Sequence, residues 1–221
     1  MRGLTRSLKY ATFRAARVIG VCLLMAVGFV FYFTFLNEQA FTVENLVSRF
    51  PFTLLLIGNL MFMIYGMLDV ATYTQLTLTY GCTRKDAAIS TVYMHLVQIL
   101  ALEAVMVSCG ILIPRQWMSV DGVTICLLSL ALFFIGSGLA LVIGILIHHF
   151  GKTAYIVVVI LASLSGGVVG GLVGFHGGTT FLMDFVMGLL NLPLLITVGI
   201  VWYAVMAVIF WFSIRKIEVR V

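Results

Sequence analysis

The chain has 221 residues, of which 62% are hydrophobic and 10% are charged, and its formal net charge is +5. So few charged residues cannot cover the surface of a water-soluble globule, which excludes a soluble enzyme or binding domain and indicates an integral membrane protein. We therefore predict an all-α, polytopic membrane protein in which residues 1–221 form a single transmembrane domain.

Residues 1–17 have the pattern of an amphipathic helix. One stripe of this helix carries small and apolar residues at helical spacing, namely Leu4, Leu8, Ala11 and Ala15. The opposite stripe carries the basic residues Arg2, Arg6, Lys9 and Arg17. We expect this segment to lie on the cytoplasmic interface with its basic side chains toward lipid headgroups. A basic leader without regular structure fits the same residues.

Six apolar runs follow, and each approaches or exceeds the roughly 17 to 25 residues that cross a bilayer as a helix. They occupy residues 18–36, 52–68, 87–113, 123–147, 155–173 and 192–212. We predict a membrane domain of six transmembrane helices over residues 18–212 and a basic cytoplasmic tail over residues 213–221.

The basic residues predict the orientation of these spans. With the N-terminus in the cytoplasm, 11 of the 13 Lys and Arg residues lie inside and only Arg49 and Arg115 lie outside. The positive-inside rule therefore places both termini in the cytoplasm. A basic flank facing anionic membrane lipid accounts for the net charge, so no nucleic acid partner is required.

The second span has a helix start signal before it and an acidic residue at its end. Thr42 and Pro51 are expected to bound a short interfacial helix that precedes the span. Asp69 follows the last apolar residue, so we place it near the inner interface, bonded to neighbouring Thr or Tyr side chains. A proton site at Asp69 is the alternative.

A short polar island separates the second span from the third. Gly81 is suited to end one helix, Thr83 to cap the next through its side-chain oxygen, and Asp86 to occupy its first turn. The segment is therefore predicted to be helix, tight turn, helix. It is interpreted either as a docking surface that presents Arg84 and Lys85 or as a plain cytoplasmic turn whose basic residues only orient the chain.

Glu103 lies within the third predicted span, with apolar residues on both sides. An ionisable group at that depth is costly and normally faces protein or a water-filled cavity. We predict a role in transport for Glu103; a buried, protonated and purely structural carboxyl group is the alternative.

Glycines at short helical spacing occur in two spans and favour close helix packing in lipid. The fourth span carries Gly136, Gly138 and Gly144, and the fifth carries Gly166, Gly170 and Gly174. The series in the fifth span is the predicted tight contact, either within one chain or between subunits.

The sequence contains no arrangement of residues typical of a membrane enzyme. No serine protease, HExxH or paired-glutamate constellation occurs, and the four cysteines share no metal-ligand spacing. We therefore predict no catalytic residues and no metal site.

The predicted layout and one motif resemble the permease subunit of a type-2 ABC exporter. The layout consists of six spans with both ends inside, an amphipathic N-terminal helix and a polar extension of the second helix; the motif is Gly81-Cys-Thr-Arg-Lys-Asp86. In that family a similar turn is the coupling helix that inserts into a separate cytoplasmic ATPase subunit. The resemblance implies that Thr83, Arg84, Lys85 and Asp86 contact this ATPase, with Gly81 shaping the turn.

The resemblance also implies the partners of the chain. ATP and Mg²⁺ are expected in the partner ATPase and no cofactor in this chain, and a second permease copy would complete a homodimer or a heterodimer. The short outer loops are similar to those of compact permeases that export peptides, bacteriocins or amphipathic toxins across the bacterial plasma membrane. A proton-coupled secondary transporter that uses Glu103, and a non-transporting membrane scaffold, are the alternatives.

Overall fold

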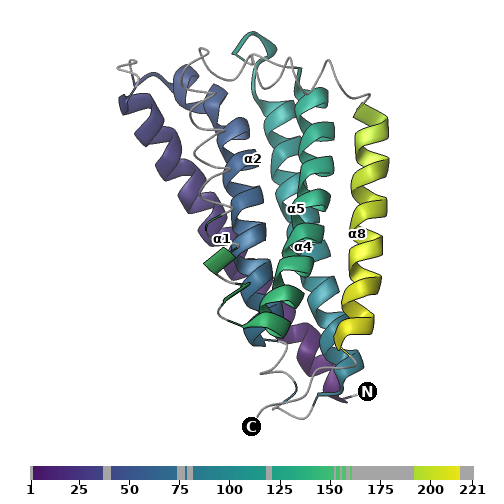
Figure 1. Cartoon of the computed structure of the whole chain (residues 1–221). Helices are drawn as coiled ribbons and strands as arrows, with labels where there is room; N and C mark the ends of the chain where they lie inside the picture. The colour runs from purple at the N-terminus through teal and green to yellow at the C-terminus, as the bar shows by residue number, and fades with distance from the viewer. Residues whose placement is uncertain are drawn as a thin grey trace.

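A computed structural model describes residues 2–36, 41–73, 78, 82–117, 121–151, 153–154, 156–157, 160 and 192–214. Its long helices are α1 (Arg2–Leu36), α2 (Val43–Leu68), α4 (Arg84–Leu112), α5 (Gly122–Phe150) and α8 (Leu192–Ile214) (Figure 1). A π-helical turn η1 (Asp69–Tyr73) follows α2, and a 3-10 turn η2 (Arg115–Trp117) follows α4.

These 5 helices are each long and apolar enough to cross a membrane. The chain is therefore all-α and has the character of a multi-pass membrane protein, as predicted. The predicted spans 87–113, 123–147 and 192–212 coincide closely with α4, α5 and α8, whereas the predicted spans 18–36 and 52–68 lie within the longer helices α1 and α2. The predicted span 155–173 lies mostly outside the described residues.

The helices form a bundle in which α5 packs against α2, α4 and α8, while α1 lies obliquely over α2 and α4 (Figure 1). α2, α5 and α8 run in one direction and α1 and α4 in the other (Figure 1). The end of the bundle where α1 and α4 begin is called the basic end here. Most basic side chains that the structure describes belong to this end: Arg6, Lys9, Arg14, Arg17, Arg84 and Lys85. Arg49 and Arg115 belong to the opposite end.

Small residues allow α5 to approach its neighbours closely. Gly136 and Gly144 face Asn59 and Val70, and a Cβ atom on Gly138 would lie 2.6 Å from the Trp202 ring of α8. The close helix contact predicted from the glycines of this span is confirmed. In lipid, where packing rather than the hydrophobic effect brings helices together, such contacts orient α2 and α8 around α5.

α1 is a single helix, although the sequence led us to expect an interfacial helix over residues 1–17 and a separate span after it. The reason is a stripe of buried, mostly small side chains that continues past Arg17 without a break: Ala11, Ala15, Val18, Cys22, Ala26 and Val30. Because both halves of the segment bury the same face, no bend is needed. Within the predicted apolar stripe, Ala11 and Ala15 are buried and Leu4 and Leu8 are half-buried, while Arg17 is exposed.

The expected end of a short helix near Pro51 is wrong. Thr42 does cap the helix, since its side-chain oxygen accepts a hydrogen bond from the Asn45 amide at 3.3 Å. α2 then continues through Pro51, whose side chain is buried. A proline inside a helix costs about 3 kcal/mol. The face that α2 buries from Thr53 onward outweighs that cost, so the helix continues past the proline.

Candidate functional site

The basic end contains an ion pair between Arg14 of α1 and Asp69 of η1. Only 11% of the Arg14 side chain and 3% of the Asp69 side chain are exposed. The sequence led us to expect neighbouring Thr or Tyr side chains as the partners of Asp69, whereas the charged partner comes from the first helix. Sequence reasoning missed this pair because the two residues meet only when α1 packs across α2.

The π-helical turn helps to place Asp69. α2 changes from α-helix to π-helix at Asp69, and the next residue, Val70, is fully buried against Gly144 of α5. A π-helical turn changes the direction in which successive side chains point, and such turns are frequent at functional sites. Val70 is thus directed to α5 while Asp69 is directed to α1.

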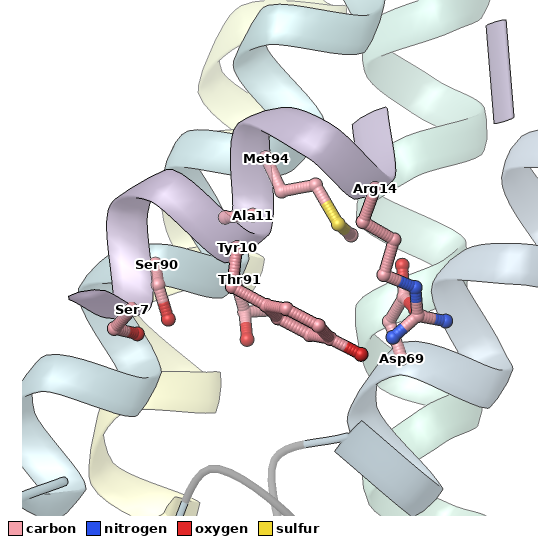
Figure 2. A pocket seen from close by; sticks show the side chains of 8 residues that line it. All are labelled: Ser7, Tyr10, Ala11, Arg14, Asp69, Ser90, Thr91 and Met94. Carbon is pink, nitrogen blue, oxygen red and sulfur yellow. The ribbon is translucent and has the colours of Figure 1, made fainter. Parts of the chain in front are cut away.

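A small pocket of about 20 Å³ surrounds the ion pair (Figure 2). In Figure 2 the side chains of Arg14 and Asp69 point toward one another, and the Tyr10 ring extends into the same pocket. The remaining lining residues come from α1 and α4: Ser7, Ala11, Ser90, Thr91 and Met94. A space of this size holds about one water-sized molecule, so the pocket is not a binding site for an organic substrate.

Further buried polar groups lie along the inner face of α4. His95 and Gln98 are 1% and 2% exposed, and within the described residues neither His95 ring nitrogen nor Gln98 Nε2 has a hydrogen-bond partner. The absence of a side chain on Gly66 makes room for the His95 ring, because a Cβ atom there would lie 2.9 Å from Cε1. An unsatisfied buried polar group costs about 1–3 kcal/mol. Such groups are rare in native proteins, so His95 and Gln98 are a notable feature of this face of α4.

Glu103 is half-buried between α4 and α5, and Ser129 Oγ donates a hydrogen bond to its Oε2 at 2.8 Å. Ser129 was not identified from the sequence, because only the register between the two helices brings it to Glu103. The structure does not bring Glu103 and Asp69 together. Thr91, which lines the Asp69 pocket, precedes Glu103 on α4 by a distance of roughly 18 Å at the 1.5 Å rise of an α-helix.

The predicted helix start at Thr83 is confirmed. Thr83 Oγ1 accepts a hydrogen bond from the Asp86 amide at 3.1 Å, and Asp86 Oδ2 accepts one from the Thr83 amide at 3.3 Å. This reciprocal capping box holds the first turn of α4, on which Arg84 and Lys85 are exposed. Gly81 and the glycines at 166, 170 and 174 lie outside the described residues.

These observations define two polar regions in the described part of the chain. One is at the basic end and combines the Arg14–Asp69 ion pair with the capped first turn of α4, and the other is the Glu103–Ser129 contact farther along the bundle. No family model, curated protein or solved structure matches this chain.

Proposed function

We propose that this chain is the membrane-spanning permease subunit of an ATP-driven exporter in a bacterial plasma membrane. Its substrate would be an amphipathic or hydrophobic molecule such as a peptide, and a separate ATPase would bind ATP and Mg²⁺. The observation that carries the proposal is the capped first turn of α4, which presents Arg84 and Lys85 at the basic end of an apolar helical bundle.

The capping box suits this turn to transmit movement. The tip, as we call Thr83 to Asp86, is held together by these two hydrogen bonds. It therefore moves with the rest of α4 as one body. α4 is 29 residues long and contacts α1, α5 and α8. A displacement of the tip by an ATPase would therefore reach the half-buried Glu103 and the helices around it.

The chemistry of the tip identifies the kind of surface it fits. The planar guanidinium of Arg84 is able to form two parallel hydrogen bonds with a carboxylate, and Lys85 adds a second positive charge. The complementary site on the ATPase is a groove with acidic side chains. The pocket beside Asp69 has a volume of only about 20 Å³, which is too small for a peptide. We therefore place the export path between this chain and a second permease copy, identical or homologous.

A second candidate is a proton-coupled secondary transporter, favoured by one specific observation. Glu103 is an ionisable residue within a membrane-length helix, and its carboxyl group is hydrogen-bonded to Ser129 of another helix. Carboxylates in such positions serve as proton sites in transporters. This candidate needs no ATPase.

Co-purification separates the two candidates. The tagged chain is expressed together with a candidate soluble ABC-type ATPase, extracted in mild detergent and reconstituted in lipid. The proposal predicts a stable complex whose ATP hydrolysis responds to substrate. Substrate movement driven by a pH gradient in vesicles without any ATPase would overturn it in favour of the secondary transporter.

A further inference from the structure

A groove of about 330 Å³ lies on the surface of the bundle between α1 and α2, next to the Arg14–Asp69 ion pair. Six of its lining residues come from α1 and one from α2: Tyr10, Phe13, Arg14, Arg17, Val18, Val21 and Tyr65. Its volume is in the range of sites that hold small organic ligands.

The groove changes in character along α1. Its lining residues on this helix follow one another at intervals of three or one residue, so they lie along a single helix face. Arg14 and Arg17 belong to the part nearer the basic end, and Val18 and Val21 to the part farther from it. Tyr10 and Phe13 line the groove on the other side of the arginines, still nearer the basic end, so the groove is cationic in its middle and apolar where Val18 and Val21 line it.

The charge of the groove is set by two guanidinium groups and one carboxylate. Arg14 is shared between the groove and the small pocket, where Asp69 compensates its charge. Arg17 is exposed and has no acidic residue beside it among the lining residues. The groove therefore has a net positive charge, which favours an anionic ligand.

We propose that this groove binds an anionic phospholipid, with its phosphate beside Arg17 and the start of an acyl chain along Val18 and Val21. A phosphate accepts paired hydrogen bonds from a guanidinium, and basic pockets between membrane helices are known to hold anionic headgroups. The aromatic ring of Tyr65 on α2 suits the boundary between headgroup and hydrocarbon, where Tyr is enriched. A free anion would use only the cationic part of this groove. The inference is independent of the ATP-driven export proposal, because it concerns only the resting chain in its membrane.

The probe is phosphatidylglycerol, compared with phosphatidylcholine of the same acyl chains, in titrations of the full chain in neutral detergent. Bound lipid is counted by native mass spectrometry, and the thermal unfolding midpoint is recorded in parallel. The informative variant is Arg17→Gln. The matched control is Lys9→Gln, which removes an exposed basic residue of the same helix that does not line the groove.

We expect phosphatidylglycerol to be retained and to raise the unfolding midpoint, and phosphatidylcholine to do neither. A basic residue near a lipid surface contributes on the order of 1 kcal/mol, so Arg17→Gln should weaken phosphatidylglycerol binding about fivefold while Lys9→Gln leaves it unchanged. Equal losses of phosphatidylglycerol binding in both variants would overturn the proposal, because they would show that the lipid is attracted by basic residues in general and not held in the groove. The same midpoint shift with inorganic phosphate or glycerophosphoglycerol would overturn the acyl-chain part of the assignment. Both variants should unfold at the wild-type midpoint when no lipid is added, which verifies that the substitutions leave the fold intact.

Discussion

Arg14 of α1 and Asp69 of the π-helical turn after α2 form an ion pair that is almost completely withdrawn from solvent. The rest of the contact between α1 and its neighbours is mostly apolar and includes buried small side chains such as Ala15 and Cys22. Desolvating two charges costs several kcal/mol per ion, and the attraction between them offsets that cost only while they remain together. The pair therefore holds α1 in one register against the end of α2.

Removing one member of this pair should destabilise the protein strongly. Asp69→Asn leaves the Arg14 charge without its compensating carboxylate, and we expect the free energy of unfolding to fall by about 3–5 kcal/mol. The double variant Arg14→Leu with Asp69→Leu should recover most of that loss, because it removes both desolvated charges. Unfolding in detergent, followed by heating or by denaturant, measures both effects.

The control for this prediction is the second ion pair, which joins Arg115 and Asp121 at 3.4 Å at the opposite end of the bundle. Its side chains are 89% and 44% exposed. Pairs of this kind contribute less than about 1 kcal/mol, so Asp121→Asn should hardly change the unfolding midpoint. Equal shifts for Asp69→Asn and Asp121→Asn would show that the Arg14–Asp69 pair has no special structural role.

The close approach of α5 to η1 should be sensitive to a single methyl group. A Cβ atom on Gly144 would overlap the Val70 side chain, which is fully buried, so Gly144→Ala must move one helix. We expect a loss of about 1–3 kcal/mol, the usual range for overpacking. Gly28→Ala, where nothing lies within 4 Å of the new atom, should instead be neutral or gain up to about 1 kcal/mol from helix propensity. A Gly144→Ala protein as stable as the Gly28→Ala protein would contradict this packing.

Glu103 is predicted to act through its charge. Glu103→Gln keeps the shape of the side chain and a partner for Ser129 Oγ, so assembly and stability should remain near wild type while export falls. Ser129→Ala tests the hydrogen bond itself, which is worth about 1.5–3 kcal/mol if the carboxyl group is ionised. Substrate transport into inverted vesicles reports the loss of export, and thermal stability measured in parallel reports the loss of the hydrogen bond. Wild-type export by the Gln variant would show that ionised Glu103 is not required.

The first turn of α4 is predicted to be the contact with the ATPase. Arg84→Ala with Lys85→Ala should leave the chain inserted and folded, because other basic residues at the same end preserve the charge asymmetry. Losing about 2 kcal/mol of charged contact should weaken ATPase binding roughly 30-fold. Co-purification and substrate-stimulated hydrolysis in lipid measure this loss.

Arg6→Ala with Lys9→Ala removes the same charge from exposed positions of α1 and serves as the control for the tip variant. This control should keep both the ATPase and its stimulated turnover. A tip variant that behaves like the control would show that Arg84 and Lys85 serve only to orient the chain.

Several features of this protein were determined by local sequence. Long apolar runs predicted α4, α5 and α8 to within a few residues, because a helix that spans lipid must satisfy its own backbone hydrogen bonds and needs a minimum length. Thr83 and Asp86 are three residues apart, so their reciprocal cap could be predicted from the chemistry of two neighbouring side chains.

Other features were decided only by tertiary structure. The continuity of α1 depends on burying one stripe along α4 and α2, and α2 continues through Pro51 because its packed face outweighs one lost hydrogen bond. The partners of Asp69 and Glu103 come from other helices, and their identities depend on how far each helix slides and rotates against the next. Side-chain periodicity specifies a helix face but not the residue opposite it. Arg14 and Ser129 therefore could not be recognised as partners until the helices were packed.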